Sequence, residues 1–166
     1  MQTSLRILGV DPGLNRCGWG LIVSEGSRLS HLAHGVIAPD PKKSLAERLA
    51  AICLGLEEVI AAHKPDEAAV EETFVNANPR AALALGQARG AVMVAVARSG
   101  LLAGEYPPAT IKKAVVGTGQ ADKAQIAFMV RRLLPACGDA GADAADALAV
   151  AICHAVHGGF KKRAGG

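Results

Sequence analysis

The feature that most constrains this chain is a short motif near its start, ILGVDPG, at residues 7–13. The apolar residues before Asp11 predict a buried strand, which Asp11 closes. Pro12 and Gly13 then turn the chain, because proline fixes φ and glycine permits a positive φ. A carboxylate at the end of a rigid strand is a good platform for a metal or phosphate site, although aspartate is also a common turn residue.

The rest of the chain alternates between strand and helix patterns. Three strands joined by short turns are expected at 7–11, 17–24 and 29–38, and two more at 67–71 and 101–106. Helical periods and their proline or glycine boundaries predict helices at 44–63, 79–99, 107–116, 121–134 and 139–157. This order predicts one α/β domain, a mixed sheet flanked by helices, over residues 1–158, with a flexible tail at 159–166. It is the order of the RNase H-like fold.

Composition narrows the functional class. The 166 residues suit one domain with its own core, no apolar run is long enough for a membrane span, and no signal peptide is evident. The four cysteines lack CxxC spacing, so we expect reduced thiols in a cytoplasmic protein. The net charge is +3, and residues 107–166 hold 8 Lys/Arg against 4 Asp/Glu, which favours a polyanionic partner.

Further acids stand at two other places in the chain. Glu71 and Glu72 end the fourth predicted strand, and the last predicted helix offers Asp139, Asp143 and Asp146 on one stripe. These acids are costly on an apolar helix unless they are solvated, paired or bound to a cation. If strand and helix acids converge, two carboxylates about 4 Å apart repel by about 4 kcal/mol at an effective dielectric of about 20. Hard oxygen ligands of this kind select Mg²⁺ or Mn²⁺, and a pair of ions would suit phosphoryl transfer.

Several motifs in order resemble one known family. ILGVDPG, CGWG, AAVEETFVNAN, ALALGQARG, KKAVVGTGQADK and GADAADALAVAICH together resemble the RuvC family of bacterial Holliday-junction resolvases, from about residue 5 to about residue 154. The set is specific, whereas DPG alone would be weak. The resemblance implies an RNase H-like homodimer that depends on Mg²⁺, with two ions per site and Mn²⁺ as a substitute. It further implies symmetric nicking of four-way junctions and cooperation with the RuvA–RuvB branch-migration complex.

The resemblance also implies roles for individual residues of this chain. It implies that the metal-binding and catalytic acids are Asp11, Glu71, Asp143 and Asp146. Phe74 matches an aromatic residue that stacks at the junction. The alternative role for Phe74 is that of a loop residue whose ring packs on the core. Lys112 and Lys123 match basic positions near the DNA backbone. The alternative is that both are solvent-exposed lysines with no part in DNA binding.

Some positions depart from the family pattern. Cys17 stands where relatives often have threonine, and Asn15 and Arg16 differ from the better-known members. The histidines show no ligand spacing. Gly86 and Gly90, within a long helix, suggest close helix packing at a dimer interface.

Three other interpretations remain open from the sequence. An actin-like or sugar-kinase ATPase also uses an Asp-x-Gly turn for phosphate and Mg²⁺, but usually needs two lobes, and ATP turnover would support it. A related YqgF-type nuclease would act on structured RNA. A junction-binding protein without catalysis would not need the four acids. A cleavage assay with Mg²⁺ distinguishes such a protein from a nuclease.

Overall fold

The sheet of the computed structural model has five strands in the order β3-β2-β1-β4-β5. The structure describes residues 3–72 and 77–160. Strands β1 (Ser4–Asp11), β2 (Cys17–Glu25) and β3 (Arg28–Ile37) form an antiparallel meander. Strands β4 (Glu67–Glu71) and β5 (Ala103–Tyr106) then extend the sheet in parallel on the other side of β1.

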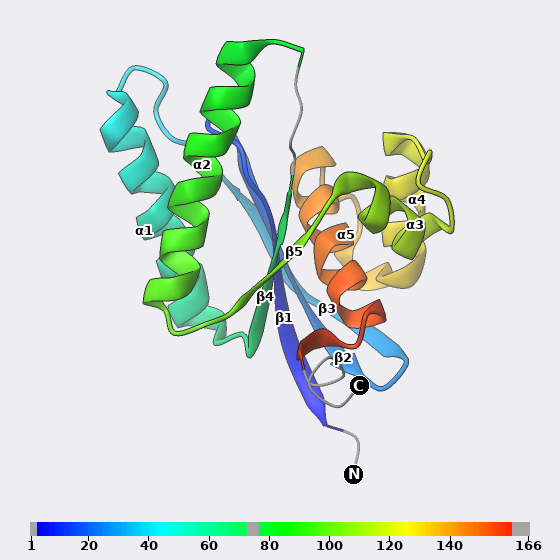
Figure 1. The fold of residues 1–166 in the computed structure, drawn as a ribbon. Helices are drawn as coiled ribbons and strands as arrows, with labels where there is room; N and C mark the ends of the chain where they lie inside the picture. Colours follow the sequence, from blue (N-terminus) through cyan, green and yellow to red (C-terminus); the bar gives the residue numbers. More distant parts are fainter. Residues whose placement is uncertain (1–2, 73–76, 161–166) are drawn as a thin grey trace.

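Two groups of helices cover the two faces of this sheet (Figure 1). Helices α1 (Leu45–His63) and α2 (Pro79–Arg98) lie on one face, around a core that includes Leu8, Val10 and Leu56. Helices α3 (Pro108–Val116), α4 (Lys123–Leu133) and α5 (Ala142–Val156) lie on the other. Strand residues on successive positions point to opposite faces, so each face has its own apolar core.

Local sequence signals set most helix boundaries. Ser44 forms a capping box with Glu47 at the start of α1, and Asp122 forms one with Gln125 at the start of α4. The side chain of Asn78 accepts hydrogen bonds from the first backbone N–H groups of α2. These caps satisfy N–H groups that have no partner inside the helix.

Helix α5 packs unusually close to the sheet because the strands beneath it carry glycine. A Cβ atom on Gly9 would lie 2.1 Å from the carbonyl oxygen of Ala147, and one on Gly18 would lie 2.1 Å from that of Asp143. Any side chain at these positions would push the helix outward. The glycines therefore set the distance between α5 and the ends of β1 and β2.

A buried polar cluster joins the far end of α5 to β4 and β5. His154 is fully buried, with Nε2 2.7 Å from Oε2 of Glu67 and Nδ1 2.8 Å from the Tyr106 hydroxyl. The ring of Phe160 packs edge-on against the His154 ring, at 5.0 Å between centroids. Polar groups buried together in this way fix one arrangement of the helix over the strands.

The predicted fold class is confirmed, and so is every predicted strand. The predicted start of the last helix at Asp139 is wrong. Residues Pro135–Cys137 form a 3₁₀ turn, Gly138 and Gly141 take positive φ values of 60° and 79°, and α5 begins at Ala142.

The predicted domain at residues 1–158, with a flexible tail at 159–166, stays a prediction. Gly159 takes a positive φ of 59°, Phe160 packs against the ring of His154, and residues 161–166 lie outside the described residues. Within the described ranges, none of the helices combines the length and the apolar character that a membrane span requires.

Candidate active site

Two acids meet where β1 and β4 end. The parallel register pairs Val10 with Val70, so Asp11 and Glu71 come next on neighbouring strands. Their side chains form a hydrogen bond with each other. Parallel strands bring their carboxyl ends to one edge of a sheet, and this edge holds both predicted strand acids.

The helix acids reach the same edge from α5. Asp143 and Asp146 lie in its first turns, three residues apart and on one face. The close contact of Gly18 with the backbone of Asp143 places this end of the helix over β2, opposite Asp11, because Gly18 pairs with Asp11 in the antiparallel register. The glycine contact thus brings residues more than a hundred positions apart to one site.

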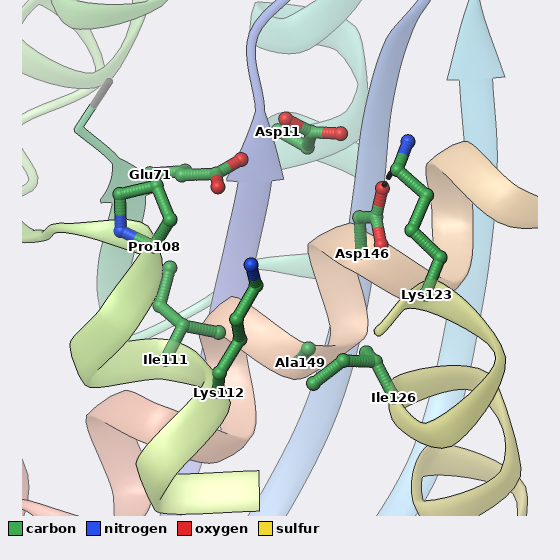
Figure 2. Close-up of a pocket in the computed structure, with 9 residues that line it drawn as sticks. All are labelled: Asp11, Glu71, Pro108, Ile111, Lys112, Lys123, Ile126, Asp146 and Ala149. Carbon is green, nitrogen blue, oxygen red and sulfur yellow. Dashed lines mark ion pairs between the residues drawn. The ribbon is translucent and has the colours of Figure 1, made fainter. Parts of the chain in front are cut away.

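An open cleft joins three of these acids to two lysines (Figure 2). Lys112 from α3 and Lys123 from α4 extend toward the acids, and Lys123 Nζ lies 3.9 Å from Oδ2 of Asp146. The full lining consists of Asp11, Glu71, Pro108, Ile111, Lys112, Lys123, Ile126, Asp146 and Ala149. The structure therefore gathers Asp11, Glu71 and Asp146 with both predicted basic residues.

Asp143 is the one of the four predicted acids that does not line the cleft. Its Oδ2 atom accepts a hydrogen bond of 2.7 Å from Nε of Arg16, and the residue does not line the cleft. Among residues 3–72 and 77–160, no three His, Cys, Asp or Glu side chains converge in a geometry that could hold a metal ion. Three acids share the cleft, and the fourth is turned to an arginine.

Burial and mutual repulsion disfavour the ionised acids. Burial, then the hydrogen bond with Glu71 and the charges of Glu71, Asp146 and Asp143, raise the pKa of Asp11 to about 9. Burial also raises the pKa of Asp146 to about 6, against the opposing effect of Lys123. Such carboxyls gain most from a nearby cation, and their donor atoms are hard oxygens, which fit Mg²⁺ or Mn²⁺ in chemistry.

Cys17 lies buried below this site as a neutral thiol. Burial raises its pKa to about 12, and the charges of Asp11 and Asp143 act in the same direction. A thiol rather than a thiolate is a poor nucleophile and a poor metal ligand. Cys17 therefore serves as a packing residue of the core that includes Leu8, Val10 and Leu56.

The remaining sequence candidates fall outside the cleft. Asp139 precedes α5, where Oδ1 accepts a bond of 3.4 Å from the N–H of Gly141, so its predicted place on the helix stripe is wrong. Glu72 follows β4, and its N–H bonds to the carbonyl of Tyr106. Phe74 lies outside the described residues.

Sequence reasoning missed two features. The Arg16–Asp143 pair had no local signal, because its members lie 127 positions apart. The Glu67–His154 pair had a weak signal, a histidine within the apolar second half of α5.

Comparison with known proteins identifies the family. The family model described as "Crossover junction endodeoxyribonuclease RuvC" matches residues 7–154. The protein of that name from Caulobacter sp. strain K31 is 61% identical over 151 residues, 91% of this chain and 89% of the relative. That from Paramagnetospirillum magneticum strain AMB-1 is 57% identical over 159 residues, 96% of each chain.

Solved structures agree with the sequence matches. The structure of T. thermophilus RuvC in complex with Holliday junction substrate matches with a TM-score of 0.86 and 32% identity, over 95% of this chain and 96% of the other. Ydc2, a yeast mitochondrial Holliday junction resolvase, shares the fold at a TM-score of 0.63 and 13% identity, covering 89% of this chain and 76% of the other.

The sheet order, the helices on both faces and the acids at the ends of β1 and β4 define an RNase H-like nuclease of the resolvase class. The chain belongs to the RuvC family of crossover junction endodeoxyribonucleases. This membership decides between the interpretations that the sequence left open, in favour of the junction nuclease over the ATPase and the RNA nuclease.

Proposed function

We propose that this chain resolves Holliday junctions by paired, symmetric nicks in strands of like polarity, during homologous recombination and DNA repair. The observation that carries the proposal is the cleft that joins Asp11, Glu71 and Asp146 to Lys112 and Lys123. It combines a set of hard anionic ligands with positive charge suited to a phosphate backbone. The relative from T. thermophilus was solved with a Holliday junction substrate, which supports the same substrate here.

The acids would hold two Mg²⁺ ions, with Mn²⁺ as a substitute. Asp11, Glu71 and Asp146 contribute from the cleft and Asp143 from its rim. Ions bound there would activate a water and stabilise the leaving 3′-oxygen, and hydrolysis would then yield a 5′-phosphate and a 3′-hydroxyl. The family membership and the raised pKa values of Asp11 and Asp146 support this assignment.

The basic residues would bind and orient the DNA. Lys112 and Lys123 come from different helices and face the same cleft, so a phosphate between them would be held beside the acids (Figure 2). Phe74 follows Glu71 by three residues, and we propose that it stacks on a base opened at the junction.

We propose that two copies act together through α2. Its exposed face carries small and apolar residues at helical spacing, namely Leu83, Gly86, Gly90, Val94 and Ala97. Among the described residues, apart from the neighbouring backbone of α2 itself, a Cβ atom on Gly86 or Gly90 would meet nothing within 4 Å, so packing there does not require glycine. A twofold dimer through this face provides two identical sites for the two symmetric strands of a junction.

The family also suggests a setting for this activity. We propose that the dimer works in the cytoplasm with the RuvA–RuvB branch-migration complex. The four cysteines are all free thiols, which fits a reducing compartment.

A cleavage assay on synthetic four-way junctions tests the proposal. Wild type with Mg²⁺ should make paired nicks in the junction and leave a duplex of the same sequence intact. Asp11→Asn and Glu71→Gln should lose nicking and retain junction binding, because removing negative charge does not weaken attraction to phosphates. Binding without cleavage by wild type would favour the junction-binding protein without catalysis, and the nuclease assignment would be wrong.

A further inference from the structure

Asp143 is paired with Arg16, which lies in a loop that is tightly folded and anchored to α1. The Oδ2 atom of Asp143 accepts a 2.7 Å hydrogen bond from Nε of Arg16, in the loop between β1 and β2. The loop is tightly folded, since a Cβ atom on Gly13 would lie 2.3 Å from the carbonyl oxygen of Arg16. Arg48 of α1 anchors it by donating to Oδ1 of Asn15 at 2.6 Å and to the carbonyl of Leu14 at 3.3 Å.

The backbone of Asp143 is equally constrained. Its carbonyl group lies against Gly18, where a Cβ atom would approach within 2.1 Å. Arg16 precedes Gly18 by two residues, so this contact also places the arginine beside the helix. With both backbones held, Asp143 can change partner only by rotation of its side chain.

The charges around the acids divide into two groups. Asp11 and Glu71 are hydrogen-bonded to each other, whereas each helix acid forms an ion pair, Asp143 with Arg16 and Asp146 with Lys123 at 3.9 Å. The Arg16 pair is closer and hydrogen-bonded. It is also partly exposed, with 59% of the Arg16 side chain and 32% of the Asp143 side chain accessible, so solvent screens it and a divalent cation can compete for the carboxylate.

We propose that Arg16 is a positioning residue that opposes metal binding. It holds the Asp143 side chain away from the cleft until a divalent cation replaces the Arg16 guanidinium as the partner of the Asp143 carboxylate. The inference rests on the proposed function, because it requires that these acids bind a cation. Arg16 offsets the charge of Asp143 in the metal-free protein, and its guanidinium opposes the entry of metal both by competing for a ligand and by repulsion. The side chain of Asp143 turns toward the cleft when the cation arrives.

The test measures Mn²⁺ binding to the full chain without DNA, by electron paramagnetic resonance of free Mn²⁺. Arg16→Gln should bind Mn²⁺ about two- to fivefold more tightly than wild type, since the variant loses a weak, screened competitor. Arg98→Gln is the matched control, because Arg98 forms a similar exposed pair with Glu57, 2.9 Å apart and remote from the site. It should leave Mn²⁺ affinity unchanged. Unchanged or weaker Mn²⁺ binding by Arg16→Gln would overturn the proposal.

A double-mutant cycle shows whether Arg16 acts through Asp143. In an Asp143→Asn background, Arg16→Gln should give little further gain in Mn²⁺ affinity. The metal-free melting temperatures of the same four proteins provide a second readout, in which coupling between the two positions is expected. Equal gains in both backgrounds would mean that Arg16 acts only through its charge, and the positioning role would be wrong.

The outcomes separate this inference from the proposed function. If wild type nicks junctions with Mg²⁺ but Arg16→Gln binds Mn²⁺ no more tightly, only the role of Arg16 fails. If wild type neither binds Mn²⁺ nor nicks junctions, the proposed function fails. Weaker junction binding by Arg16→Gln, with unchanged Mn²⁺ affinity, would instead identify Arg16 as a phosphate contact and overturn its role in metal loading.

Discussion

The carboxyl groups of Asp11 and Glu71 are hydrogen-bonded to each other at the neighbouring ends of β1 and β4. Burial and this bond raise the pKa of Asp11 from 3.8 to about 9. Between these values the folded protein keeps a proton that the unfolded chain has released. The metal-free free energy of unfolding therefore decreases as pH rises from about 4 to about 9, and Asp146 adds the same trend up to about pH 6.

We expect Asp11→Asn to flatten this dependence. A full proton difference changes the free energy of unfolding by about 1.4 kcal/mol per pH unit, or about 4 °C in melting temperature for a domain of this size. Thermal unfolding in EDTA from pH 5 to pH 8 measures it. Glu58→Gln, on the exposed side of α1, should keep the wild-type slope. A slope in Asp11→Asn equal to that of wild type would contradict the assigned cause.

Metal binding should release a proton. At pH 7 Asp11 is protonated, so a cation that binds its carboxylate must displace that proton. We expect Mn²⁺ affinity to rise by up to about tenfold per unit between pH 6.5 and 8. Calorimetric titration in buffers of different ionisation enthalpy counts the protons directly. Identical binding enthalpies in all buffers would show that Asp11 is not a ligand.

The two lysines of the cleft should contribute more to the salt dependence of junction binding than a lysine outside the cleft. Lys112→Ala and Lys123→Ala should each lower the slope of log affinity against log salt by about 0.9 for junction DNA, if each contacts one phosphate. Lys113 is exposed on the same helix as Lys112 but does not line the cleft. Lys113→Ala is therefore the matched control, and an equal effect at all three positions would indicate a general charge effect.

If two copies pair through α2 as proposed, placing a charge on that helix should separate them without unfolding the chain. Val94 is 51% exposed, so Val94→Glu should leave the melting temperature within a few degrees and produce monomers in sedimentation experiments. On a supercoiled plasmid with an extruded cruciform, paired nicking linearises the plasmid and independent nicking gives nicked circles. Val94→Glu should give mainly nicked circles. Leu32→Glu, an exposed position on the edge strand β3, should behave as wild type, and a dimeric Val94→Glu would rule out this face.

The buried pair of His154 and Glu67 should be important for stability. His154→Phe keeps most of the ring volume but removes the partner 2.7 Å from the Glu67 carboxylate, and we expect a loss of about 3 kcal/mol in the free energy of unfolding. Urea denaturation at pH 7 measures it. Adding Glu67→Leu should restore part of the loss, because an apolar pair carries no desolvation penalty. No recovery in the double variant would point to packing as the cause.

Much of the site followed from local sequence. Asp11 ends a strand whose apolar run is contiguous, so its placement needed only the strand pattern, whereas the same pattern did not separate Glu71 from Glu72. The start of α5 was harder, because alanine and glycine around residue 140 carry no strong period. The chain there follows the positive φ values of Gly138 and Gly141, which a helical pattern does not reveal.

Long-range pairs were not predictable for a different reason. The pairing of Arg16 with Asp143 depends on how closely α5 approaches β2, and that distance follows from the absence of a side chain at Gly18. The sequence displays the glycine but not the helix that lies against it. Likewise, His154 meets Glu67 only because α5 crosses β4.

The packing of α5 on Gly9 and Gly18 also has a consequence during synthesis. The ribosome releases residue 11 long before residue 146, and a growing chain folds from its N-terminal part onward. Until α5 emerges, the glycine-lined strip of sheet is uncovered and the strand acids have no partners opposite them. If Asp143 and Asp146 bind metal as proposed, the nascent chain cannot cut DNA, because the helix that completes its core also supplies these two acids.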